Sequence, residues 1–173
     1  QLSINSSIIE NGIADGIKIM LIPVKMIKNP FRRTEHSWIV LCDCCLESGE
    51  NLNKYNRRNI ESNLENDPYQ CQLSFKQEFS ILDSKTNKPY GWSEQNNLKN
   101  YHGVINNDLL ENRLLIDSII DNIMYAGMEL KNIISEKFMG KWSFTIKRTN
   151  ILNACDSIII LRYIIFYSGI KQN

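Results

Sequence analysis

The chain has 173 residues, of which 43% are hydrophobic, so it is long enough to bury a core and form about one to two domains. Twenty basic and nineteen acidic residues leave a formal charge of +1. No basic stripe stands out that would attract a phosphate backbone, which argues against a nucleic-acid partner.

The cysteines and the start of the chain bear on the cellular compartment. Five cysteines, an odd number without zinc-finger spacing, and no visible N-terminal signal region together predict free thiols and a cytoplasmic location. The chain begins with Gln1 rather than Met, which leaves a processed product, an engineered form and a fragment open.

The first predicted elements are two strands. Ile17–Met26 and Ser37–Leu46 are apolar, β-branched runs separated by a loop at Asn29-Pro30. The polar tract Glu47–Asp67 is typical of a connector with a short helix. Alternation within the second strand favours core thiols over a metal site for a group of three cysteines, Cys42, Cys44 and Cys45.

Residues Leu73–Leu82 read LSFKQEFSIL, an alternating pattern that predicts one strand. Lys76 and Glu78 share its polar face, about 6.6 Å apart on an ideal strand. That span suits two carboxylates holding neighbouring divalent cations. Here one of the two residues is itself a cation.

The sequence of the second half of the chain predicts a helix, a strand and another helix. Asp108–Gly127 has an apolar stripe, with Asp108 as cap and Gly127 as the C-terminal stop. Lys141–Ile146 alternates as a strand, and Ala154–Ser168 is a helix closed by Gly169.

The last of these helices raises the question of a membrane. Its apolar run, Ile158–Tyr167, is too short for the roughly 20 residues that span a bilayer, and Arg162 interrupts it. We therefore expect a buried helix and no membrane role.

Several motifs, in order, resemble the glutamine synthetase family. FKQEF, followed by PYGWS at 89–93, is similar to its E-Q-E-Y and G-W-P segments. Upstream, L-x-P-V-x-M, N-P-F-R-R, V-L-C-D-C and N-R-R are similar to the later part of its N-terminal β-grasp domain. Downstream, Y-A-G at 125–127 and DSIIILRYI at 156–164 resemble parts of its catalytic domain.

The resemblance implies an α+β fold in two parts. Residues 1–63 would be the remnant of a β-grasp domain with its connector, and residues 64–173 the first part of the catalytic domain, an antiparallel sheet with packed helices. The chain would then represent about two-fifths of a typical member. With its first strands missing, the β-grasp remnant is expected to have unpaired strand edges.

The resemblance also implies a magnesium or manganese site, because the family holds two divalent ions that neutralise charge during phosphoryl transfer. Glu78 and Glu136 match two ligands of one metal position. Ser143 stands in W-S-F where the family has a third carboxylate, and Lys76 replaces the ligand of the second metal. An ammonium cannot coordinate a metal, so Lys76 is expected to pair with Glu78 or Glu136 instead.

ATP binding is implied by the same comparison. Phe144 and Ile146 fall on the nucleotide-binding segment, but its I-G-P becomes Ile146-Lys147-Arg148. Lys147 and Arg148 could attract phosphate, although two adjacent loop cations are more often simply solvated. Ile4 takes the place of the family's acid-base Asp, and the P-Y-Y-C-G-V-G loop survives only as residues 100–105. The later catalytic His, the substrate arginines and the flap glutamate are absent.

The function implied by the family is ligation of glutamate and ammonia to glutamine at the expense of ATP, and the substitutions predict that this chain is impaired or inactive. Three alternatives stay open. The chain is a structural or regulatory subunit that forms homo- or hetero-oligomers with full-length relatives, a fragment of an active ligase completed by a missing C-terminal half, or a reading frame that has decayed. Without the resemblance, the favoured interpretation of Glu78 is a solvated or salt-bridged strand residue, and that of Glu136 is a surface loop carboxylate.

Overall fold

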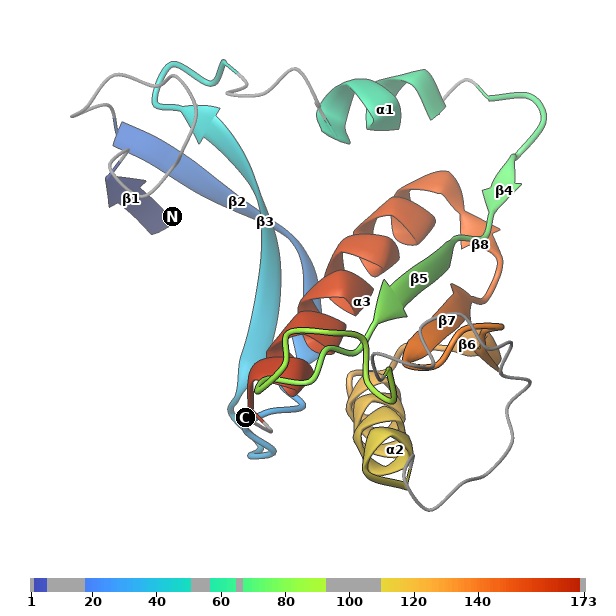
Figure 1. Cartoon of the computed structure of the whole chain (residues 1–173). Coiled ribbons are helices and arrows are strands. Elements are labelled where there is room, and N and C mark those ends of the chain that lie inside the picture. The colour runs from blue at the N-terminus through green and yellow to red at the C-terminus, as the bar shows by residue number, and fades with distance from the viewer. Residues whose placement is uncertain (1, 6–17, 51–56, 65–66, 93–109, 172–173) are drawn as a thin grey trace.

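The computed structural model describes residues 2–5, 18–50, 57–64, 67–92 and 110–171 (Figure 1). It is a mixed α and β protein in which every named strand pair is antiparallel. Two three-stranded sheets lie on either side of the C-terminal helix (Figure 1). This agrees with the α+β expectation.

The N-terminal sheet has the order β1-β2-β3, formed by β1 (Leu2–Asn5), β2 (Lys18–Lys28) and β3 (Trp38–Leu46). Both predicted strands are present. The register between β2 and β3 shifts between Pro23 and Lys25, where a proline cannot donate a hydrogen bond to the ladder. Strand β1 pairs with β2 and makes it the central strand, so the open edges expected for this sheet fall on β1 and β3 among the described strands.

The second sheet has the order β5-β7-β6, with β5 at Lys76–Ser80, β6 at Leu130–Ser135 and β7 at Lys141–Ile146. A separate short pair joins β4 (Gln72–Leu73) to β8 (Thr149–Asn150). The single strand predicted over Leu73–Leu82 is therefore wrong. Between its two parts, Ser74 Oγ donates to the carbonyl of Ile146 at 2.7 Å, and the Phe75 carbonyl accepts from the Ile146 amide at 3.0 Å.

Three helices complete the described part of the chain: α1 (Arg57–Leu64), α2 (Leu110–Tyr125) and α3 (Ile151–Lys171). The predicted stop of α2 is confirmed. Gly127 adopts a positive φ of 79°, its amide bonds the Met124 carbonyl at 2.9 Å, and the Met128 amide bonds the Ile123 carbonyl at 3.1 Å. These two bonds define a Schellman motif. The predicted cap Asp108 lies outside the described residues.

Helix α3 is longer than predicted at both ends. It starts at Ile151, where Asn150 Oδ1 accepts from the Asn153 amide at 2.9 Å, and it continues through Gly169 to Lys171. Gly169 is not among the glycines with positive φ, so it does not form the left-handed turn that ends a helix.

The core lies where α2 and α3 meet the second sheet (Figure 1). From α2 and α3 come isoleucines and leucines that are almost fully buried, and from β7 come aromatic and aliphatic side chains. Its most buried members are Ile116, Ile119, Ile123, Phe144, Ile146, Leu161 and Ile164. This packing accounts for the apolar sequence of both helices.

Among the described residues, one helix is long and apolar enough to cross a membrane when only length and composition are considered, and it is α3 over Ile151–Ile170. The apolar run expected from the sequence, Ile158–Tyr167, is therefore shorter than the apolar helix of the structure. In this structure Ala154, Leu161 and Ile164 of α3 are fully buried against the core, as in the central helix of a packed domain.

The N-terminal sheet and α1 are joined to α3 by polar and aromatic contacts. Lys25 Nζ donates to Asn153 Oδ1 at 3.2 Å and to Ser157 Oγ at 3.1 Å. Arg57 of α1 makes a two-pronged ion pair with Asp156, which is 4% exposed. Helix α3 is thus the common support of both halves of the described chain.

Candidate functional site

The candidate site lies on one face of β5 and β7. Their antiparallel register places Lys76 opposite Thr145, Glu78 opposite Ser143, and Ser80 opposite Lys141. Directly opposed residues of an antiparallel pair point to the same face, so these side chains share one surface. The intervening residues, such as Phe79 and Phe144, turn to the other side, where their rings pack edge to face at 5.1 Å.

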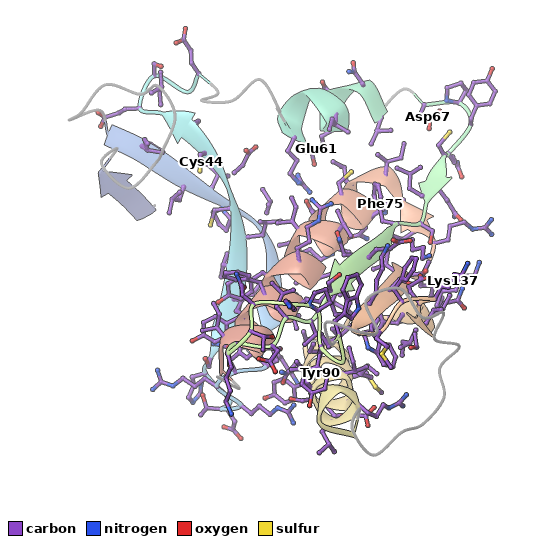
Figure 2. The ribbon with its side chains drawn as sticks, viewed as in Figure 1. Cys44, Glu61, Asp67, Phe75, Tyr90 and Lys137 are labelled. Carbon is purple, nitrogen blue, oxygen red and sulfur yellow. The ribbon has the colours of Figure 1, made fainter. Side chains whose placement is uncertain are left out.

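Glu136 is brought to this face by the turn between β6 and β7. Its amide donates to the Lys141 carbonyl at 2.9 Å, and the Lys141 amide closes the turn on the Phe138 carbonyl at 3.1 Å. The segment 81–92 braces the turn from outside, because Trp92 Nε1 donates to the Met139 carbonyl at 3.0 Å. Figure 2 labels Tyr90 of this segment and Lys137 of the turn.

Four charged groups on this face form one continuous chain of ion pairs. Lys76 Nζ lies 2.6 Å from Glu136 Oε1 and 3.0 Å from Glu78 Oε1. Lys141 Nζ lies 2.7 Å from Glu78 Oε2. We call Lys76, Glu78, Glu136 and Lys141 the lysine–glutamate cluster. Two ammonium groups and two carboxylates make it formally neutral, and the expectation that Lys76 pairs with Glu78 or Glu136 is confirmed for both.

The charges stabilise each other in the expected directions. The ammonium of Lys76 has a raised pKa, chiefly because it donates to Glu136 and then to Glu78. The pKa of Glu78 is lowered by Lys141 first and Lys76 second. The pKa of Glu136 is lowered by Lys76 first and the Ser143 hydroxyl second. All three groups are therefore firmly charged at neutral pH.

Ser143 is the buried residue of the site and lies opposite Glu78 on β7. It is 0% exposed, and its hydroxyl lies near the Glu136 carboxylate without making a well-aligned hydrogen bond. A glutamate side chain at this position would extend toward Glu78 and Glu136 from the opposing strand. The serine leaves that space without a third carboxylate.

These residues do not fit a divalent metal. Both carboxylates already contact Lys76, and the ammonium lies between them where a cation would have to sit. Within the described ranges, no group of three or more His, Cys, Asp or Glu side chains is arranged to hold a metal ion. Hard cations such as Mg²⁺ require several oxygen ligands free of competing positive charge.

The two residues predicted for nucleotide binding are core residues. Phe144 is 0% exposed and Ile146 is 2% exposed. Ile146 borders a cavity of about 400 Å³ together with Lys25, Lys147 and Arg148. Lys147 is ion-paired with Glu129, and the Lys25 ammonium already contacts α3.

The other sequence-derived candidates do not join the lysine–glutamate cluster. Ile4 lies in β1, in the other sheet, and residues 100–105 lie outside the described residues. The five cysteines are free thiols, with Cys45 buried and Cys71 exposed.

Lys141 is the member of the cluster that sequence reasoning missed. Alternation along β7 put Lys141 and Ser143 on one face, which was the available signal. Its contact with Glu78 depends on the pairing register of β5 and β7, which no local pattern specifies.

Comparisons with known proteins identify the family of the chain. The glutamine synthetase catalytic domain matches residues 54–172. Glutamine synthetase root isozyme 3 of Zea mays is 27% identical over 154 residues, covering 86% of this chain and 43% of the relative. Glutamine synthetase of Hordeum vulgare and glutamine synthetase cytosolic isozyme 1-1 of Oryza sativa subsp. japonica show the same identity and coverage.

A solved structure titled "GmaS/ADP complex-Conformation 1" superposes with a TM-score of 0.73 at 13% sequence identity, covering 99% of this chain and 40% of that one. At this identity the likeness shows the fold. The family match over residues 54–172 and the fold thus define a partial catalytic domain of the glutamine synthetase type. The chain belongs to the glutamine synthetase family and spans less than half the length of the relatives it matches.

Proposed function

We propose that this chain is a glutamine synthetase homologue that, by itself, does not join glutamate and ammonia. The observation that carries the proposal is the position of Lys76, whose ammonium contacts both Glu78 and Glu136. The family's reaction transfers a phosphoryl group from ATP, and divalent ions neutralise the charge that develops. A lysine held in this place excludes the ion and offers no vacant coordination site to ATP.

We also propose that the chain has two parts. Residues 1–63 are the remnant of a β-grasp domain and residues 64–173 the first part of the catalytic domain, supported by the separate sheet β1-β2-β3. Magnesium or manganese and ATP are the family's cofactors, and this chain binds them weakly or not at all. A cytoplasmic location is supported by five unpaired thiols. Neither a nucleic acid nor a membrane is part of the proposal.

The test is an assay of glutamine formation. The purified chain is supplied with glutamate, ammonia and ATP, with Mg²⁺ or Mn²⁺ over a wide range of concentration, and the maize root isozyme 3 is assayed in parallel. We expect product from the maize enzyme and none from this chain. Metal-dependent turnover by the chain alone would refute the proposal.

A second candidate is a structural or regulatory subunit that associates with full-length relatives as a mixed oligomer. It is favoured by the apolar side chains that α3 leaves exposed, among them Phe166 at 69% and Ile170 at 54%. Size-exclusion chromatography of the chain mixed with a full-length relative tests it. A mixed oligomer is expected, and separate elution at every ratio would argue against it. Another alternative, a fragment completed by a C-terminal half, predicts activity once that half is added, whereas a decayed reading frame predicts neither activity nor a mixed oligomer.

A further inference from the structure

Strand β3 carries two thiols on the outer face of the N-terminal sheet, the face turned away from the core. Alternation along β3 puts Ile39 and Cys45 on the inner face, where Ile39 packs against the core and Cys45 is 5% exposed. Cys42 and Cys44 therefore share the outer face with Val40, which is 43% exposed, and both are half-buried. Among these three cysteines, the expectation of core thiols is confirmed for Cys45 and wrong for Cys42 and Cys44.

The two outer thiols are neighbours on this face. Residues two apart on a strand have Cα atoms about 6.6 Å apart, so the sulfur atoms of Cys42 and Cys44 can both reach an ion lying between them. Both cysteines are free thiols. Cys42 Sγ donates to the Val40 carbonyl at 3.9 Å, and because a thiol is a weak donor, this contact does little to oppose a rotation that turns Sγ toward Cys44.

The surroundings of the two thiols offer no further ligand of the usual kinds. The register of β2 and β3 places Pro23 opposite Cys42 and Leu21 opposite Cys44, and both of these neighbours are apolar. Asp43 belongs to the inner face, and its Oδ1 accepts from the Cys44 amide at 3.1 Å. Across the described part of the chain, no third His, Cys, Asp or Glu side chain completes a metal-binding group with this pair.

Two soft sulfur ligands without an oxygen or nitrogen ligand select one kind of metal ion. Mg²⁺ and Ca²⁺ require several oxygen ligands. Zn²⁺ takes four ligands in its structural sites, so two thiolates do not satisfy it. Copper(I) prefers thiolates, and two of them in a linear arrangement complete its coordination.

We propose that Cys42 and Cys44 bind one copper(I) ion on the outer face of β3. Each thiol gives up its proton to the solvent, the two thiolates become the ligands, and the copper stays in the +1 state. Figure 2 labels Cys44 on the N-terminal sheet. The site is independent of the proposed loss of glutamine formation, because the lysine–glutamate cluster lies on the other three-stranded sheet.

The experiment titrates the purified, reduced chain with copper(I) in the absence of oxygen, in competition with the coloured chelator bicinchoninate. We expect one copper(I) ion per chain. Cys42→Ser and Cys44→Ser should each lower the affinity by about a hundredfold or more, because the loss of a ligand costs more than the loss of a hydrogen bond to a ligand.

Cys71→Ser is the matched control. Cys71 is an exposed free thiol that precedes β4, away from the N-terminal sheet, so this variant should bind copper(I) as tightly as the wild type. Equal affinities in the wild type, Cys42→Ser and Cys44→Ser would overturn the proposal, as would a loss of affinity confined to Cys71→Ser.

A second measurement uses the wild type alone, so it does not depend on the folding of variants. The native chain is alkylated with iodoacetamide with and without one equivalent of copper(I), and the labelled cysteines are located by tandem mass spectrometry. Copper(I) should slow the labelling of Cys42 and Cys44 and leave that of Cys71 unchanged. Protection of Cys71 instead, or of no cysteine, would overturn the proposal.

The same labelling experiment with Zn²⁺ tests the identity of the metal. Zn²⁺ should protect neither Cys42 nor Cys44, because two thiolates do not fill its coordination sphere. Equal protection by Zn²⁺ and copper(I) would overturn the assignment to copper(I), since it would require ligands beyond these two thiols.

Discussion

The ammonium of Lys76 lies 2.6 Å from Glu136 Oε1, which belongs to one of the two carboxylates that the resemblance assigns to a metal position. This contact replaces neutralisation by an ion with neutralisation by a side chain. Because Lys76 also contacts Glu78, removal of the lysine would leave two carboxylates facing each other and a local negative charge. The site is therefore still organised for a cation, although its own lysine supplies that cation.

Restoring carboxylates to the site should restore metal binding. Lys76→Glu combined with Ser143→Glu removes the competing ammonium and supplies the missing ligand, so the affinity for Mg²⁺ should rise by roughly tenfold or more. Isothermal titration calorimetry measures it. The control is Lys147→Glu, which makes the charge change of Lys76→Glu at the Glu129 pair instead. Equal affinities in wild type, control and double variant would mean that the backbone no longer holds the ligands in range.

The cluster should also make the chain sensitive to acid. Glu78 and Glu136 have lowered pKa values, so the stability they contribute is present above the ordinary carboxyl pKa of 4.5 and is lost as the pH falls through the lower native values. Lys76 has a raised pKa, so its contribution is present below 10.5 and is lost only as the pH rises through the higher native value. The network is intact between these limits.

Lys76→Met should therefore lose less stability than the wild type between pH 7 and pH 3, because its carboxyls titrate closer to their unfolded pKa values. Urea unfolding followed by circular dichroism at several pH values gives the free energy of unfolding of each protein as a function of pH, and the two slopes are compared. Lys131→Met, at an exposed lysine of β6 outside the cluster, should follow the wild type. Parallel curves for Lys76→Met and the wild type would show that the ion pairs contribute nothing to folding.

Sequence reasoning predicted the pairing of Lys76 because a strand fixes which neighbours share a face, and because the resemblance to the family pointed to Glu136 in a distant segment. It missed the break at Ser74 and Phe75, since the alternation runs on while the strand changes partner from β8 to β7. That exchange depends on Ile146, 72 residues from Ser74 in the sequence, and no local pattern encodes it.

The ends of α3 were missed for a related reason. Gly169 is a strong helix stop in isolation, yet the helix runs through it because Ile164 and Ser168 before it are buried in the packed domain. Tertiary burial outweighs the local cost of a helical glycine, which is about 1 kcal/mol.

The pair Arg57–Asp156 should respond unequally to removal of its two partners. Arg57→Ala leaves a carboxylate that is 4% exposed without its guanidinium, and the free energy of unfolding should fall by about 3 kcal/mol. Asp156→Ala leaves a guanidinium whose side chain is 22% exposed and can reach water, so the loss should be about 1 to 2 kcal/mol.

Urea unfolding of both single variants and of the double variant checks this. The double variant should lose less unfolding free energy than the sum of the losses in the two single variants. Single losses of equal size would mean that Asp156 is better solvated than its burial indicates.

Two glycines with positive φ allow the cost of backbone strain to be measured separately from the cost of a steric clash. Gly49, with φ of 87°, has nothing within 4 Å of an added Cβ, whereas a Cβ on Gly140, with φ of 73°, would lie 2.9 Å from both the amide nitrogen and the carbonyl oxygen of Tyr90. Gly49→Ala should therefore cost only the left-handed penalty of about 1 kcal/mol. Gly140→Ala should cost about 3 kcal/mol, because the clashing atoms are backbone and cannot rotate away.

The Gly140→Ala substitution should also affect the lysine–glutamate cluster. The Gly140 carbonyl accepts from the Ile81 amide at 2.8 Å, and Gly140 directly precedes Lys141 in the turn that presents Glu136. Displacement of this turn should weaken the contact between Lys76 and Glu136, so Gly140→Ala should also flatten the acid dependence of unfolding while Gly49→Ala preserves it. Chemical denaturation at pH 7 and pH 3 measures both effects. An unchanged acid slope in Gly140→Ala would show that the turn does not position Glu136.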